Sequence, residues 1–182
     1  MALMLTVTGC IEVTFPEPMP QHRRELSKFP KSWRGTWTTD VNGEEGAGED
    51  EIMVILDQSI VSNDDTITLG NEVVLHRMGC RLVLNLAEEE GARWTVMVAE
   101  RNKDQLNVRS FDAAQTGSIA RWEAIIGSDN VVKIHRDDDP NEKLKEIQLN
   151  PKSNRQFKKL VDGGASELVM YQRVKNPPSP AE

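Results

Sequence analysis

Paired cysteines, long apolar runs and an excess of positive charge are all missing from this chain of 182 residues. Its two cysteines, Cys10 and Cys80, form no C-x-x-C pair, which excludes a disulfide framework and a cysteine zinc site of the usual spacing. No apolar stretch approaches the roughly 18 residues that a membrane-spanning helix needs. Asp and Glu number 29 against 22 Lys and Arg, and the net charge of −7 opposes binding to a phosphate backbone, so no nucleic acid partner is expected.

Catalytic and metal-binding patterns are also missing. His22, His76 and His135 stand far apart and outside any H-E-x-x-H spacing, so they are interpreted as surface histidines rather than metal ligands. There is no Gly-x-Ser-x-Gly elbow, and no glycine-rich loop precedes a helix. Two acidic runs, residues 44–51 and 137–142, lack the spacing of a calcium loop and are typical of solvated hairpin turns. We therefore expect no enzyme activity, no metal and no cofactor.

What the sequence does contain is alternation of apolar and polar side chains over most of residues 26–175, which is typical of antiparallel β-strands. Turn-forming residues such as Asn42-Gly43 and Ser128-Asp129-Asn130 interrupt the alternation. The pattern predicts roughly nine to ten strands joined by short links. Sets that share one face of a predicted strand include Ile52, Val54 and Leu56; Leu82, Leu84 and Leu86; Trp94, Val96 and Val98; and Ala120, Trp122, Ala124 and Ile126.

One helix is predicted near the end of this unit. Asn150 is a candidate N-cap, Pro151 suits the first helical position, and Phe157, Leu160 and Val161 have the spacing of a buried helical stripe before a pair of glycines. We therefore predict an all-β fold with one short helix. Its antiparallel meander would close into an up-and-down β-barrel or fold into a barrel-like sandwich.

The interior of such a barrel is predicted to be apolar. Its inward residues are Leu, Val, Ile and Trp with hardly a charge, so a hollow interior would suit only an apolar guest. The candidate lining residues are Leu82, Leu84, Trp94, Val96 and Trp122. For Trp94 and Trp122, packing in a filled core is the alternative.

The uncharged start of the chain ends in Val7-Thr8-Gly9-Cys10, which resembles a bacterial lipobox. The resemblance implies a signal remnant over residues 1–9, acylation of Cys10 and attachment to a membrane through that lipid. The alternative is a first β-strand over residues 2–15, where apolar side chains share a parity. Acylation would leave Cys80 unpaired, either as a reactive thiol between two arginines or as a small strand residue.

Proline marks both ends of the predicted domain. Pro16, Pro18 and Pro20 indicate an extended tether over residues 10–25. Residues 176–182 are predicted to be a disordered tail, which leaves residues 26–175 as the barrel-like domain.

Gly35-Thr36-Trp37 resembles the first-strand Gly-x-Trp signature of lipocalin-like barrels. In that family the glycine permits a tight turn into the strand and the tryptophan plugs one end of the barrel. The resemblance implies that Arg173, on the last predicted strand, is the basic residue that stacks over the tryptophan.

A second resemblance covers more of the chain. Several segments are together similar to a group of small uncharacterised lipoproteins of Bacteroidetes-type bacteria. They are residues 15–20, Leu26 with Phe29-Pro30, the Gly35-Thr36-Trp37 motif, and Leu84-Asn85-Leu86 followed by Trp94. This resemblance implies a place in the cell envelope, at the outer membrane. It brings no activity with it.

Two hypotheses of function follow. In the first, the chain is a lipid-anchored cell-envelope protein with a binding or scaffolding role, as an accessory subunit of a larger envelope assembly with a protein partner. In the second, it is a lipocalin-like carrier of a small apolar ligand. A filled core with an exposed apolar patch would favour the first, and an empty apolar cavity would favour the second.

Overall fold

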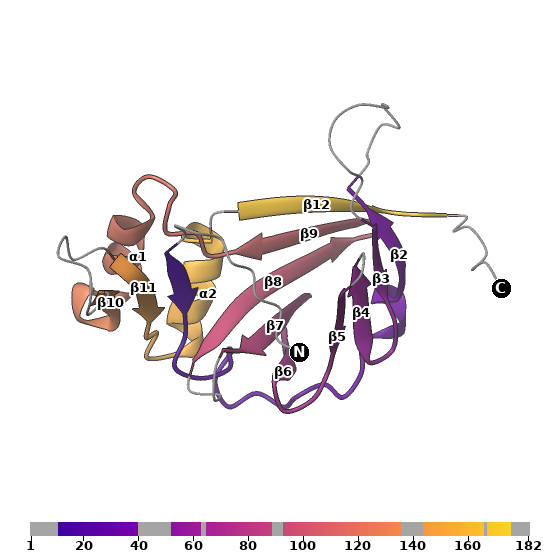
Figure 1. Ribbon diagram of the computed structural model, residues 1–182, viewed down its shortest axis with the longest axis horizontal. Helices are drawn as coiled ribbons and strands as arrows, with labels where there is room; N and C mark the ends of the chain where they lie inside the picture. The colour runs from indigo at the N-terminus through magenta and orange to yellow at the C-terminus, as the bar shows by residue number, and fades with distance from the viewer. Residues whose placement is uncertain are drawn as a thin grey trace.

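The computed structural model describes residues 11–39, 52–62, 65–88, 93–135, 144–165 and 167–175. Its largest element is an antiparallel sheet that curls into a nearly closed barrel, seen on the right of Figure 1. The sheet has nine strands in the order β5-β4-β3-β2-β12-β9-β8-β7-β6. These strands are β2 (Gly35–Thr38), β3 (Ile52–Ile55), β4 (Ser59–Ser62), β5 (Asp65–Thr68), β6 (Val73–Met78), β7 (Arg81–Ala87), β8 (Trp94–Asn102), β9 (Gln105–Ser110) and β12 (Glu167–Arg173). The predicted all-β antiparallel barrel is confirmed.

The two edges of this sheet, β5 and β6, lie end to end rather than side by side. Because every pair in the sheet is antiparallel, the two edge strands run in the same direction. Leu69, just after β5, is still next to β4, because its N–H donates to Gln58 O just before that strand. Glu72, three residues later, is already next to β7, because its carbonyl accepts from Ala87 N. The link between β5 and β6 therefore passes from one edge of the sheet to the other, and among the described residues no strand pairs with the outer edge of β6.

Residues 25–29, which we call the strap, cover that open edge. The N–H of Leu26 donates to Leu75 O on β6 at 2.8 Å, and the N–H of Phe29 donates to Asp57 O in the β3–β4 turn at 2.7 Å. Lys28 and Asp57 add an exposed ion pair of 3.0 Å. The strap thus bridges the seam that the sheet leaves open.

A second unit, the annex, packs against the outer face of β7 and β8 and lies on the left of Figure 1. It consists of a three-stranded sheet, β1 (Glu12–Thr14), β11 (Leu144–Leu149) and β10 (Val131–His135), and two helices, α1 (Ser118–Ile126) and α2 (Asn154–Gly163). Val83, Val96 and Val98 on the barrel wall meet Trp122, Phe157 and their neighbours in one buried cluster. The strands β7 and β8 therefore have the annex on one face and the interior of the barrel on the other.

Residues 11–25 are part of the annex, which corrects the predicted tether. Phe15 and Met19 are fully buried, and the Phe15 and Trp94 backbones exchange two hydrogen bonds of 2.9 Å. The fully buried Asn85 side chain accepts from Met19 N and donates to Met19 O, and His76 Nδ1 lies 2.9 Å from the same carbonyl. The prolines shape an irregular segment that is anchored by the apolar residues between them, so proline density alone did not predict its packing.

Residues 118–126 form the helix α1, which corrects the strand predicted over Ala120–Ile126. The helix buries Ser118, Trp122 and Ile126 at intervals of four residues. An interval of four fits a period of two as well as the helical repeat, which is why the alternation was misleading. The helix lies between two glycines with positive φ, Gly117 (81°) and Gly127 (87°).

The predicted late helix exists as α2, but it begins later than expected. Ser153 is its N-cap, and the hydroxyl oxygen accepts from Gln156 N at 3.3 Å. The Gln156 side chain in turn accepts from Lys152 N at 2.7 Å. This reciprocal pattern replaces the cap predicted at Asn150. Phe157, Leu160 and Val161 are buried, as their spacing indicated.

Candidate functional site: an apolar cavity in the barrel

The barrel encloses a partly open cavity of about 190 Å³. Its walls come from alternate residues of the strands, because side chains on one strand point in turn inward and outward. The lining residues are Phe29, Trp33, Met53, Ile55, Ile60, Ser62, Ile67, Leu75, Leu82, Leu84, Met97, Ala99, Leu106, Val108 and Tyr171. Among the described lining residues none carries a charge at neutral pH, and Ser62 and Tyr171 bring the side-chain hydroxyls.

Size and lining decide what the cavity can hold. It is smaller than the roughly 300–1,000 Å³ of sites for drug-sized ligands. It is larger than the roughly 150 Å³ apolar cavity that stays dry and binds benzene. A charged group would lose its hydration there without a partner, since no lining side chain carries a charge. The cavity therefore suits a small neutral molecule or a short hydrocarbon chain.

One end of the barrel is closed by stacked side chains. A 3₁₀ helix, Lys31–Trp33, leads into β2, and the fully buried Trp37 donates from Nε1 to Trp33 O at 3.1 Å. The guanidinium carbon of Arg173 lies 4.7 Å from the centroid of the Trp37 ring, and Nη2 donates to Ser32 O at 2.7 Å. This is the arrangement that the Gly-x-Trp resemblance implied for Trp37 and Arg173.

Gly35 makes this closure possible. Its φ of +131° is a backbone conformation that residues with a side chain rarely adopt. A Cβ built on it would lie 3.5 Å from Arg173 Nη1, so the backbone and the guanidinium lie against each other. The glycine thus sets the turn that brings the first strand under Arg173.

The residues proposed from the sequence divide between the two sides of the barrel wall. Leu82 and Leu84 line the cavity. Trp94, Val96 and Trp122 do not line it, since Val96 and Trp122 belong to the buried cluster under the annex and Trp94 lies beside Phe15. Cys10, the proposed lipidation residue, lies outside the described residues, as do residues 1–9 and the tail 176–182.

Sequence reasoning missed Met97 and Ala99, which line the cavity from β8. Met97 has the opposite parity to Trp94, Val96 and Val98, the set that the sequence predicts to face inward. The alternation showed correctly which residues share a face. However, the face with Val96 and Val98 packs on the annex, and the face with Met97 and Ala99 lines the cavity. One signal was available, because Met97 and Ala99 make the second face of β8 apolar at two adjacent inward positions.

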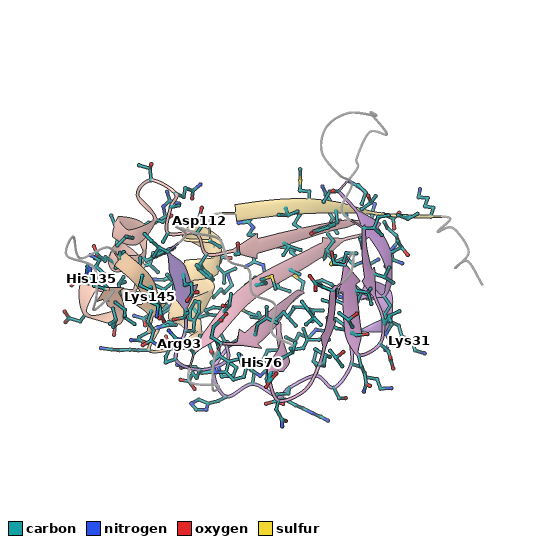
Figure 2. The ribbon with its side chains drawn as sticks, viewed as in Figure 1. Lys31, His76, Arg93, Asp112, His135 and Lys145 are labelled. Carbon is teal, nitrogen blue, oxygen red and sulfur yellow. The ribbon has the colours of Figure 1, made fainter. Side chains whose placement is uncertain are left out.

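Several titratable residues outside the cavity are engaged structurally. Figure 2 shows Arg93 beside the annex, where it pairs with the fully buried carboxylate of Glu146. This hydrogen bond raises the pKa of Arg93 above its usual value. Thr14 Oγ1 donates to the other carboxylate oxygen at 2.5 Å, so Glu146 ties β1 and β11 to Arg93, the residue before β8. His76 is buried under Met19 rather than at the surface, and Cys80 is exposed, 3.9 Å from Glu100 Oε1.

Within the described ranges, no group of three or more His, Cys, Asp or Glu side chains is placed to hold a metal ion. Among the same residues, no helix has the length and apolar character to cross a membrane. Comparisons with protein-family models, with curated proteins and with solved structures found no match.

Proposed function

We propose that the protein binds a small apolar molecule inside its barrel. The observation that carries the proposal is the cavity of about 190 Å³, which is open in part and has no charged side chain in its lining. Phe29, Trp33 and Tyr171 contribute aromatic rings to its lining, and Met53 and Met97 contribute flexible side chains that can adapt to an apolar guest. The Gly-x-Trp and arginine closure at one end is consistent with a carrier of the lipocalin-like type.

Benzene is a suitable first probe because its size matches the cavity. At ten times its Kd a ligand stabilises the folded state by about 1.4 kcal/mol. For a chain of this length that corresponds to a rise in Tm of about 3–5 °C. We expect this rise for the wild-type protein, measured by circular dichroism with and without benzene.

Ala99→Phe places a ring in the cavity between Leu82 and Val108, its neighbours across the sheet. This variant is expected to lose the benzene-dependent rise in Tm. Ala124→Phe is the matched control, since Ala124 lies exposed on α1 and away from the cavity. An equal rise in all three proteins would place benzene outside the barrel and refute the proposal.

We also propose that lipid on Cys10 holds the protein at a bacterial cell envelope, at the outer membrane. The lipobox-like Val7-Thr8-Gly9-Cys10 supports this. Because β1 begins at Glu12, a lipid on Cys10 would hold the annex directly against the bilayer rather than at the end of a tether.

Mass spectrometry of the N-terminal peptide from native membranes should find an acylated Cys10, and Cys10→Ser should move the protein to the soluble fraction. An unmodified peptide that extends through Cys10 would contradict the anchor.

A role as an accessory subunit of an envelope assembly is the second candidate. It is favoured by two exposed apolar residues on the outer side of the barrel. Ile52, the first residue of β3, is 48% exposed, and Leu56, the residue after β3, is 46% exposed. The double variant Ile52→Lys and Leu56→Lys should then run as a smaller complex on native gels of detergent-solubilised membranes. An unchanged complex size would count against this surface as the contact.

A further inference from the structure

A second pocket, of about 360 Å³, lies in the barrel wall at the seam between β5 and β6. It is bounded by the strap on one side and by the β5–β6 link and β6 on the other. The residues around it are Glu25, Leu26, Ser27, Gln58, Leu69, Gly70, Asn71, Val73, Val74 and Leu75. Leu75 also lines the apolar cavity, so the two pockets lie on either side of the same buried side chain.

The lining of this seam pocket differs in chemistry from that of the cavity. Gln58 and Asn71 bring side-chain amides, Ser27 brings a hydroxyl, and Glu25 brings the one ionisable group. Within the described part of the chain, no hydrogen bond or ion pair engages the Glu25 carboxylate. The neighbouring cation Lys28 is already paired with Asp57 at 3.0 Å. The pocket therefore offers hydrogen bonds and one free negative charge.

The strap that separates the two pockets is held by few bonds. Its backbone N–H groups form two hydrogen bonds, Leu26 N to Leu75 O and Phe29 N to Asp57 O. Its carbonyl oxygens accept from Arg34 Nε at Phe29 (2.8 Å) and, in a long contact of 3.4 Å, from Gln58 Nε2 at Ser27, and the exposed Lys28–Asp57 pair lies beside them. Phe29 faces the apolar cavity, whereas Leu26 and Ser27 face the seam pocket. An outward movement of the strap, together with a shift of the Leu75 side chain, would join an apolar chamber to a polar one.

We propose that the ligand is an amphiphile with a short hydrocarbon chain and an amine head. The chain occupies the barrel cavity, and the head lies in the seam pocket with its positive charge facing Glu25 and its N–H groups donating to Gln58 and Asn71. This inference rests on the proposed function and names the class of ligand for the same cavity. A carboxylate head is disfavoured, because the one charged side chain among the described residues that line the seam pocket is the negative Glu25.

The head group can be tested at constant chain length with three compounds: hexylamine, hexanol and hexanoate. Their affinities are measured by calorimetry at pH 7, where the amine is protonated and the acid is ionised. The wild-type protein is expected to bind hexylammonium about five- to tenfold more tightly than hexanoate, the size of effect that an exposed ion pair allows. Glu25→Gln should bring hexylammonium to the affinity of hexanol and leave hexanol unchanged. Glu12→Gln, a substitution of an exposed glutamate in the annex, should change none of the three.

Failure of this inference and failure of the proposed function give different results. If all three compounds bind equally and Glu25→Gln changes nothing, while Ala99→Phe abolishes binding, the cavity binds chains and the amine head is wrong. If hexanoate binds most tightly, the head assignment is also overturned. If none of the three compounds binds and benzene does not raise the Tm, the proposed function fails and the inference fails with it.

Discussion

Replacing Phe15 by alanine is expected to lower the free energy of unfolding by about 3–5 kcal/mol, the usual cost of removing a buried aromatic ring. Phe15 is fully buried, and its ring lies 5.3 Å from that of Phe111 and 5.8 Å from that of Phe157, both edge-to-face. These contacts join the N-terminal segment, the end of β9 and α2. The loss is expected as a shift in the midpoint of urea denaturation at constant slope.

Arg23→Ala is the control for this variant, because Arg23 is exposed in the same N-terminal segment. It should change the free energy of unfolding by less than about 0.5 kcal/mol. If Phe15→Ala were as mild as Arg23→Ala, residues 11–25 would behave as the free tether that the prolines suggested, and the annex as described would be wrong.

Gly164→Ala is expected to destabilise the protein by about 2–4 kcal/mol, from overpacking and the loss of a buried hydrogen bond. A Cβ on Gly164 would lie 2.8 Å from Trp122 Cδ1 and 2.9 Å from the backbone oxygen of Leu160. The Trp122 ring cannot retreat freely, because it is fully buried and its Nε1 donates to Gly164 O at 2.8 Å. Thermal unfolding monitored by tryptophan fluorescence would show the loss.

The neighbouring glycine provides a matched control. A Cβ on Gly163 would meet nothing closer than Ile125 Cδ1 at 3.7 Å, which is an ordinary contact. Since Gly163 is the last residue of α2, Gly163→Ala should be neutral or stabilising by up to about 1 kcal/mol. Equal effects at the two positions would show that the close packing of α1 on α2 through Trp122 is incorrect.

Alternation in the sequence predicted the barrel well because most of its strands expose only one face to solvent. It gave the correct inward set for β7 but the wrong one for β3, where Met53 and Ile55 line the cavity and Ile52 and Leu56 are exposed. It also failed for β8, which has the annex on one side and the cavity on the other. There the parity of Trp94, Val96 and Val98 identified a shared face correctly but assigned it to the wrong side of the wall. Parity alone cannot distinguish inside from outside when both faces are buried.

Long-range contacts account for what the sequence did not predict. The annex depends on pairings such as Glu12 with Glu146, which no local pattern records. The seam depends on the strap, whose backbone bonds to Leu75 and Asp57 join segments far apart in the chain. In contrast, the closure by Gly35, Trp37 and Arg173 could be anticipated, because the motif resembles one with a known geometry and its two ends lie on the first and last strands of the barrel.

The most direct test of ligand binding in the barrel is to identify what the protein carries when it is purified from the cells that make it. Organic-solvent extraction followed by mass spectrometry should release one class of small molecule with a short hydrocarbon chain from the wild-type protein and from Ala124→Phe. The same molecule should be absent from Ala99→Phe, whose cavity is filled. Identical extracts from the wild type and Ala99→Phe would contradict the account.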